Sequence, residues 1–351
     1  MLTESPTISE PQKEPEKVII GYIPYTIKKG DTLYDIARNY NVTTNDIQKA
    51  NLDKIKDQGL IMAGETIRIP QFGTEDELAE SNGLPKGYIR GIDISEYQGN
   101  IDWDLLEAAY NRKEFSYIII RICENINSRQ EREFCLDKKF EENLTECNKR
   151  GIPYGFYTIS RGTTEEEINK ETRELCAYIK NNLTGIKGDK DLTFNPSMPI
   201  YMDPFEDPNG AQYKMLERGE YFRCANIIDT WCKNMEDEGL YPGVYLNNNH
   251  RLLIGYTEKG QEILDNYPLW VASYPTSNTV SVKDCQSITV PFDGSIISQQ
   301  VTCTGRVDGI SGNVDASITD EKIINRVIEY RKNNKIKTKR GVKKRIYCQH
   351  A

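Results

Sequence analysis

Residues 116–123 read SYIIIRIC, a run that only Arg121 interrupts with a charge. Near-continuous apolar runs are typical of strands that are buried on both faces. Comparable runs recur: YIRGIDIS (88–95), IPYGFYTIS (152–160), MPIYMD (198–203), PGVYLN (242–247), PLWVASY (268–274) and SIISQQVT (295–302). Helical patterns lie between several of them: from Trp103, through Phe140 and Cys147, over 164–179, and around 221–235. This alternation predicts an α/β fold, a TIM-like (β/α) barrel, with function at the carboxyl ends of its strands.

A second unit precedes the barrel, with a strand at either end and two short helices between them. Gly30 permits a tight turn after the first strand, and Asp31 or Thr32 is expected to cap the first helix. Thr44 or Asn45 is expected to cap the second. The pattern predicts a small βααβ domain.

Composition shifts divide the chain further. We expect a disordered leader (1–20), the βααβ domain (21–70), a polar linker (71–88), the barrel (89–330) and a basic tail (331–351). The tail holds nine of the 45 Lys and Arg and none of the 53 Asp and Glu. It is either a contact for a polyanion or a solvated helix end. The acidic remainder argues against a nucleic-acid-binding surface.

Histidine and cysteine usage narrows the chemistry. The 351 residues include two histidines, His250 and His350, which argues against a zinc hydrolase with several His ligands. Nine cysteines form no CxxC pair and are expected to be reduced and mostly buried. We expect no metal and no other cofactor, so hydrolytic chemistry would have to use carboxylates.

Acidic residues stand at several expected strand ends. Asp93 ends YIRGID, Glu124 follows YIIIRIC, Asp203 ends PIYMD, and Asp315 lies in GNVDAS. Glu206 comes shortly after Asp203. Carboxyl groups that converge on a barrel mouth suit general acid–base work on a glycosidic bond, or a divalent cation. Any single one of them would otherwise serve as a helix cap.

Aromatic residues accompany these acids. The faces of Tyr and Trp rings stack on sugars, although most aromatics in a barrel serve packing. The candidates for sugar contact are Tyr97, Tyr157, Trp270 and Tyr274, together with Glu124.

Residues 25–70, YTIKKGDTLYDIARNYNVTTNDIQKAN…GLIMAGETIRIP, resemble a LysM domain along their whole length. The resemblance implies binding of N-acetylglucosamine-containing chains, such as peptidoglycan or chitin, in a groove between two loops. Carried over to this chain, those loops contain Gly30, Asp31 and Thr32, and Leu60, Ile61 and Met62.

Residues 89–320 resemble the glycoside hydrolase family 25 lysozymes, or N-acetylmuramidases. GIDISEYQGNIDW (91–103), YIIIRICEN, GIPYGFY, YPGVYLN, LWVASY and GISGNVDAS (309–317) occur in the family's order. The resemblance implies cleavage of the β-1,4 bond between N-acetylmuramic acid and N-acetylglucosamine. It also implies that Asp93, Asp203 and Asp315 are site residues.

The family's Asp-x-Glu pair is altered here. The chain reads Asp203-Pro204-Phe205-Glu206, so an ungapped reading puts Phe205 in the place of the general acid. Because side chains alternate along a strand, Asp203 and Phe205 would share a face and Glu206 would point away. A bulge at Pro204 would bring Glu206 into the site as the acid, with Glu124 as a weaker candidate.

Two functions stay open at this point. One is an active muramidase with a wall-binding LysM domain, acting on peptidoglycan in the bacterial cell wall. The other is a degenerate barrel that binds wall glycan as a phage or spore structural protein. The start of the sequence shows no Sec signal, and no apolar run is long enough to span a membrane. We therefore expect synthesis in the cytoplasm and delivery by a phage or by another non-Sec route.

Overall fold

The computed structural model describes residues 18–51, 55, 60–73, 84, 87–127, 132–183, 194–275, 278–290, 292 and 295–334. The chain divides into two compact units between Gly83 and Leu84. Most of the expected leader, linker and basic tail lies outside the described residues. Among the described residues, no helix combines the length and the apolar character needed to cross a membrane.

The smaller unit has the predicted βααβ order: β1 (Val18–Thr26), α1 (Leu33–Asn39), α2 (Thr44–Lys49) and β2 (Thr66–Gly73). The two strands pair antiparallel. Thr32 caps α1 by accepting a hydrogen bond from the Asp35 N–H. The expected cap of α2 is wrong by one residue: Thr43 accepts from the Asp46 N–H, and the Asp46 carboxylate accepts from the Thr43 N–H. This reciprocal pair fixes where α2 begins.

Buried apolar side chains and one buried amide hold this unit together. Ile36, Ile47, Ile67 and Ile69 form its core. Asn51 is fully buried, donates to the carbonyls of Ile47 and Arg68, and accepts from the Arg68 N–H. This amide therefore ties the end of α2 to β2.

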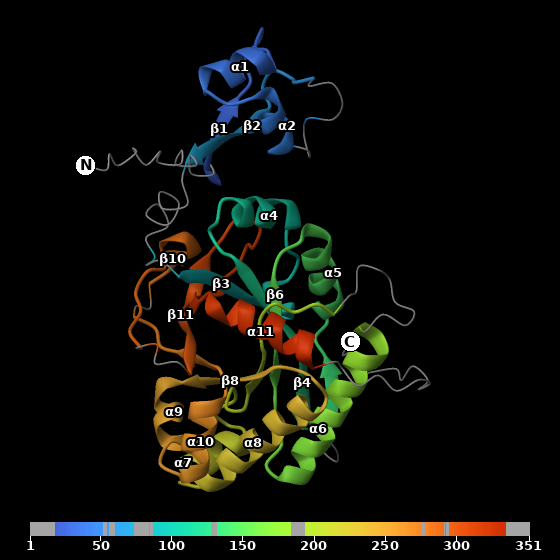
Figure 1. Cartoon of the computed structure of the whole chain (residues 1–351), viewed down its shortest axis with the longest axis vertical. Coiled ribbons are helices and arrows are strands. Elements are labelled where there is room, and N and C mark those ends of the chain that lie inside the picture. Colours follow the sequence, from blue (N-terminus) through green and yellow to red (C-terminus); the bar gives the residue numbers. More distant parts are fainter. Residues whose placement is uncertain are drawn as a thin grey trace, which may run out of the picture. The chain divides into compact units, whose positions relative to one another are not determined.

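The larger unit is the predicted barrel (Figure 1). Its strands are β3 (Tyr88–Ile94), β4 (Tyr117–Asn127), β6 (Tyr154–Ile159), β7 (Ile200–Asp203), β8 (Pro242–Asn247), β9 (Leu269–Ala272), β11 (Ile296–Arg306) and β12 (Val314–Asp320). They pair in this order, and β12 pairs with β3 to close the barrel. Each pairing from β3 to β11 is parallel, whereas β12 is antiparallel to both of its neighbours.

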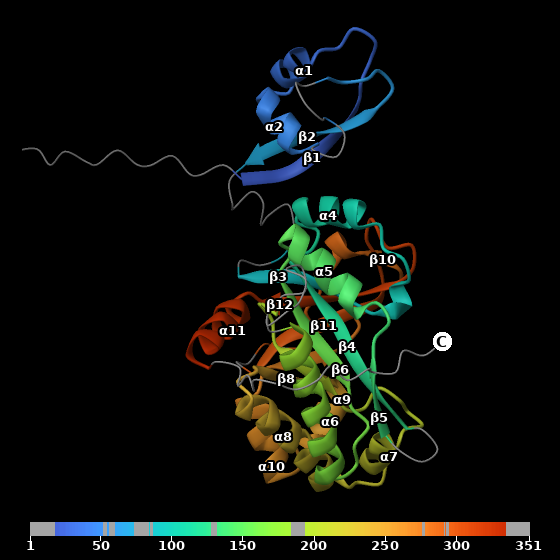
Figure 2. The ribbon, with the colours of Figure 1, turned by 90° about the vertical axis from the view of Figure 1, so that its right-hand side faces the viewer.

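Helices cover the outside of the barrel: α4 (Trp103–Asn111), α5 (Phe140–Arg150), α6 (Glu165–Tyr178), α7 (Ala211–Glu217), α8 (Tyr221–Asp237), α9 (Asn248–Ile254) and α10 (Glu258–Asn266). Helix α11 (Lys322–Asn333) packs instead against the inward-facing layer. Shorter turns are η1 (Glu96–Gln98), η2 (Ile179–Leu183) and η3 (Val282–Asp284). Helix α8 packs between α6 and α10 (Figure 2). The sequence did not predict β5 (Arg132–Leu136), which forms a hairpin with β4, or the short β10 (Val280–Ser281) beside β11.

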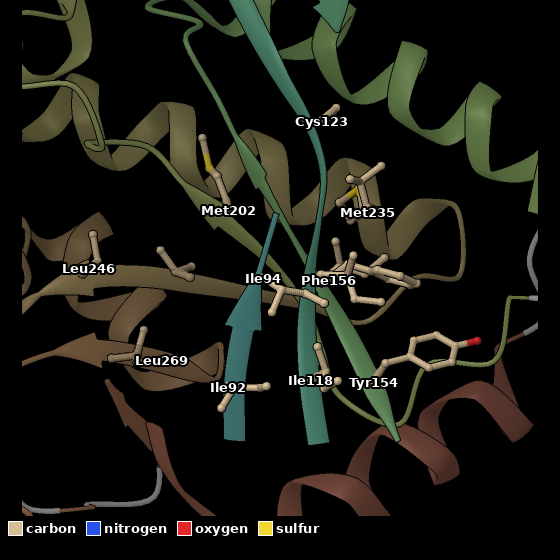
Figure 3. Packing of buried hydrophobic residues seen from close by; sticks show 14 of the residues in the cluster. Ile92, Ile94, Ile118, Cys123, Tyr154, Phe156, Met202, Met235, Leu246 and Leu269 are labelled. Carbon is tan, nitrogen blue, oxygen red and sulfur yellow. The ribbon is translucent and has the colours of Figure 1, made fainter. Parts of the chain in front are cut away.

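Two apolar layers follow from the alternation of side chains along the strands. Ile92, Ile118 and Phe156 face outward and pack with helix residues such as Met235 of α8 (Figure 3). The residues between them, such as Tyr117, Ile119 and Tyr201, face inward. They fill the barrel down to Ile323 and Val327 of α11. The core is therefore packed, and polar groups collect at the carboxyl ends of the strands.

Of the nine cysteines, the structure describes eight. They form no disulfide with one another, and seven are buried while Cys303 is exposed. This agrees with the expectation of reduced and mostly buried thiols.

Candidate functional site

Asp93 and Asp315 lie directly opposite each other at the mouth of the barrel. They are register partners in the antiparallel pairing of β3 with β12, which the sequence did not foresee. Cβ atoms of such partners are about 4.5–5.5 Å apart. The structure therefore brings together two acids that are more than 200 residues apart in the sequence.

Gln300 of β11 joins this pair. Its Nε2 donates to Asp93 Oδ2 at 3.0 Å and to Asp315 Oδ2 at 3.1 Å. Its Oε1 accepts from the hydroxyls of Tyr245, at 2.7 Å, and Tyr274, at 2.8 Å. The two hydroxyl donors fix which end of the amide is oxygen, so the NH₂ group must face the carboxyls.

The environment of this pair favours the protonated form of a carboxyl group. Burial raises the pKa of Asp93 well above its usual range, and the negative charge of Asp315 raises it further. Burial also raises the pKa of Asp315, to about 6. Two adjacent acids, of which Asp93 is buried and Asp315 half-buried, cannot both ionise without a large cost in free energy, and a neutral amide between them offers little compensation.

Asp203 ends β7, on the far side of the mouth from β3. Its side chain is 7% exposed. Within the described part of the chain, its carboxylate receives one hydrogen bond, from the Phe205 N–H to Oδ1 at 3.3 Å. Burial raises the pKa of Asp203 to about 7, the Glu206 carboxylate adds to the rise, and the Arg161 cation opposes it. Its second carboxyl oxygen receives no hydrogen bond from the described residues.

Phe205 does not point into the site. Strand β7 ends at Asp203, so the expectation that Asp203 and Phe205 share a face is wrong. Phe205 is 5% exposed and lies in the outer apolar layer, where its ring packs edge-on against His250 at 5.2 Å between centroids. Glu206, the next residue, turns back toward the mouth.

The bulge lies in β4 and not at Pro204. The pairing of β4 with β6 shifts register between Arg121 and Cys123, so that Ile122 and Cys123 both face the outer layer. The extra residue reverses the alternation that follows. Glu124 consequently turns toward the mouth.

Arg161, just after β6, connects the two glutamates. Its Nη2 donates to Glu124 Oε1 at 2.6 Å and to Glu206 Oε2 at 2.7 Å. The structure therefore brings Glu124 and Glu206 together as acceptors of one cation. Asp203 is not an acceptor of this cation, although both glutamates and Arg161 affect its pKa.

Tyr97 offers an exposed ring on the loop after β3. Its ring is 78% exposed and lies 4.8 Å from the guanidinium carbon of Arg121. Arg121 is held by Asp137 at 2.7 Å and Glu96 at 2.9 Å. A ring that rests on a fixed cation is pre-positioned for a ligand.

The other aromatic candidates differ in exposure. Trp270 is 3% exposed, and its Nε1 donates to Ser317 Oγ inside the barrel, so its ring has no surface for a sugar. Tyr157 is half-buried beside it, with centroids 6.3 Å apart. Tyr274 is 45% exposed, which leaves part of its ring open at the mouth.

In the smaller unit, the first candidate loop is tightly built. Gly30 has a φ of +95°, which favours glycine. Asp31 Oδ2 accepts from the Lys28 N–H at 2.8 Å and the Tyr25 hydroxyl at 2.7 Å, while Thr32 serves as the cap of α1.

The second candidate loop of the smaller unit presents apolar side chains. Leu60 and Met62 are 75% and 61% exposed, and Ile61 between them packs partly on the core. Two exposed apolar side chains beside a rigid turn make a surface that a glycan can contact.

Sequence reasoning missed the groups that organise the mouth. Gln300 and Tyr245 lie in strands that were recognised only for their apolar pattern, and Arg161 lies in a loop. No local signal marks these residues, because their partners come from other strands.

Comparison with known proteins finds a matching family model for each of the two units. Residues 25–70 match the LysM domain model, and residues 92–310 match the model of glycosyl hydrolases family 25. Lysozyme M1 of Streptomyces globisporus is 24% identical over 237 residues, which cover 65% of this chain and 66% of that protein. The chain thus spans just under two thirds of that relative's length.

Solved structures resemble the barrel. The Clostridium perfringens spore cortex lytic enzyme SleM matches 69% of this chain and 70% of its own, at 17% identity and a TM-score of 0.50. The modular autolysin LytC from Streptococcus pneumoniae matches 67% of this chain and 47% of its own, at 22% identity and a TM-score of 0.48. The family model covers more than half of the sequence, so the chain belongs to glycosyl hydrolases family 25 and carries a LysM domain ahead of its barrel.

Proposed function

We propose that the chain is a peptidoglycan-binding N-acetylmuramidase, which hydrolyses β-1,4 bonds between N-acetylmuramic acid and N-acetylglucosamine. Family membership supports the reaction class. The observation that carries the proposal is Asp203: a buried carboxyl at the mouth of the barrel, with a free oxygen and a pKa of about 7. A general acid works best when its pKa lies near the working pH.

Asp203 is the proton donor in this proposal. It protonates the glycosidic oxygen as the bond to the anomeric carbon breaks, and the carbonyl oxygen of the substrate's own N-acetyl group attacks that carbon. Water then opens the cyclic intermediate and gives a proton back to Asp203. Asp93 and Asp315, held by Gln300, orient and polarise the acetamido group.

This assignment differs from the one expected from the sequence, which gave proton donation to Glu206. Glu206 and Glu124 both accept hydrogen bonds from the Arg161 guanidinium, an arrangement that suits an ion pair and not proton donation to a leaving group. Asp203 has no cation bonded to it among the described residues.

The LysM domain would bind the same polymer. Tethering a second glycan-binding module to the barrel raises its effective concentration on an insoluble wall. We also propose that the protein reaches the wall by phage release or by another non-Sec route, since the eight described cysteines form no disulfide with one another and seven of them are buried.

One observation favours the second candidate, a glycan-binding barrel without hydrolysis. Phe205 stands at the family's acid position in an ungapped reading, and its side chain is committed to the outer apolar layer. If Asp203 does not replace that acid, the leaving alcohol departs unprotonated and the rate falls about 10²–10⁴-fold.

Hydrolysis of isolated peptidoglycan by the full chain separates the two candidates. The products are reduced with borohydride and analysed by mass spectrometry, with heat-unfolded protein as the control. New reduced muramic acid ends would establish the muramidase, whereas new reduced glucosamine ends would contradict the bond assignment. A folded protein that sediments with the wall and releases nothing would leave the binding function.

A further inference from the structure

The Arg161 backbone is anchored rigidly at the rim of the barrel mouth. Its N–H donates to Glu171 Oε1 at 3.1 Å, and the hydroxyl of Ser160 donates to the other oxygen of Glu171 at 2.6 Å. Glu171 is 4% exposed on α6, and Gln212 of α7 donates to the Gly162 carbonyl on the other side of Arg161. The guanidinium therefore projects from a fixed base.

One nitrogen of that guanidinium serves two carboxylates from different parts of the fold. Nη2 contacts Glu124, which follows the register shift within β4, and Glu206, in the loop after β7. The arginine side chain is 14% exposed, and the two glutamates are 28% and 46% exposed. The ion pairs are thus shielded on the arginine side and open to solvent on the glutamate side.

Asp203 faces a defined set of titratable groups. Glu206 and Glu124 raise its pKa, and Arg161 lowers it. Asp93 of β3 and Tyr245 of β8 also interact with it across the mouth. His250 of α9 packs against the ring of Phe205. Burial lowers the pKa of His250 to about 4, so this side chain is uncharged at neutral pH. Arg161 is a cation in this set, and a second cation, Arg121, lies 4.0 Å from Glu124 through its Nη1.

We propose that Arg161 is a positioning residue, which holds Glu124 and Glu206 side by side against Asp203 and so sets the pH range over which Asp203 keeps its proton. The proposal rests on the muramidase function proposed above. It adds a residue that acts on the reaction through another group and does not itself touch the reacting atoms.

The sign of each effect follows from the charges. A cation near a carboxyl lowers its pKa, and a neighbouring anion raises it, by about 1–3 units at close range. Replacing Arg161 with a neutral residue therefore raises the pKa of Asp203. Replacing Glu206 with Gln removes the largest anionic contribution and lowers it.

Carboxyl ¹³C NMR of the full chain, labelled at the aspartate carboxyl carbons, tests this without requiring activity. The Asp203 signal is assigned by its loss in Asp203→Asn. We expect Arg161→Gln to move the Asp203 midpoint up by about 1 pH unit, Glu206→Gln to move it down, and Arg161→Lys to keep it near the wild-type value. Lys233→Gln, which removes a cation from an exposed ion pair on α8, is the matched control and should shift nothing.

The alkaline limb of the kcat/KM profile should move in the same directions as the Asp203 midpoint. An unchanged or lowered midpoint in Arg161→Gln would overturn the proposal. If that variant fails to fold, Glu206→Gln provides the test, because an unchanged Asp203 midpoint in that variant would also contradict the proposal. The two outcomes can also separate. If the Asp203 midpoint rises in Arg161→Gln and falls in Glu206→Gln, but the wild-type protein hydrolyses no peptidoglycan at any pH, the role of Arg161 is supported and the muramidase function is refuted.

Discussion

On one side of the barrel mouth the Asp93 and Asp315 carboxyls share the neutral amide of Gln300, whereas on the other side Arg161 binds Glu124 and Glu206 beside Asp203. Among the described residues, the first arrangement leaves the buried Asp93 and the half-buried Asp315 without a cation. The second places a cation on two partly exposed glutamates and leaves the buried Asp203 without a direct ion pair. Both sides therefore keep buried carboxyl groups that retain protons near neutral pH, by different means.

The largest expected effect concerns Phe205. The ungapped reading of the sequence predicts that Phe205→Glu would restore a general acid, whereas the structure places this side chain in the outer apolar layer. A buried, unpaired carboxylate costs several kcal/mol, so we expect the variant to lose about 3–5 kcal/mol of stability and to gain no activity. Urea unfolding measures the loss.

Phe222→Glu is the matched control, because Phe222 is 60% exposed on α8 and should tolerate the change. A stable Phe205→Glu variant with increased hydrolysis would mean that residue 205 faces the site after all.

A smaller effect is expected at Gln300. Gln300→Leu removes the shared partner of two carboxyls and two tyrosine hydroxyls. Leaving buried polar groups unpaired costs about 1–3 kcal/mol, which we expect in the free energy of unfolding. Gln261→Leu, at an exposed amide on α10, should cost much less. Equal costs for the two variants would show that the Gln300 network does not stabilise the fold.

The smallest effect is the pH dependence of stability. The pKa of Asp203 rises from 3.8 to about 7 on folding, so the folded state binds the proton more tightly than the unfolded state. Stability is then highest below pH 4 with respect to this group and falls as the pH rises from about 4 to about 7. We expect the loss between pH 6 and 7.5 to be about 1–2 kcal/mol smaller in Asp203→Asn. Identical pH profiles for the two proteins would contradict the raised pKa.

The sequence was sufficient for the barrel and for the βααβ domain, because apolar runs and helix caps are local features. It placed Asp93 and Asp203 near the ends of predicted strands for the same reason, whereas the role of Asp315 came from the family resemblance. The sequence did not predict side-chain positions that depend on how two strands pair. The antiparallel β12 sets Asp315 opposite Asp93, and the register shift between β4 and β6 turns Glu124 toward the mouth.

The region around residue 204 shows the limit most clearly. The alternation rule requires a strand, and β7 stops at Asp203, so the rule gave the wrong direction for both Phe205 and Glu206. Arg161 was not foreseen because an arginine in a loop has no pattern until its two acceptors are known.

The most direct test of the central claim, that Asp203 and not Glu206 donates the proton, compares kcat/KM for Asp203→Asn and Glu206→Gln on solubilised peptidoglycan strands at pH 5.5. At this pH both the wild type and Glu206→Gln should hold the Asp203 proton in a substantial fraction of molecules. We expect Asp203→Asn to lose about 10²–10⁴-fold and Glu206→Gln to stay within about tenfold of the wild type. A loss in Glu206→Gln as large as in Asp203→Asn, or a nearly active Asp203→Asn, would contradict the claim.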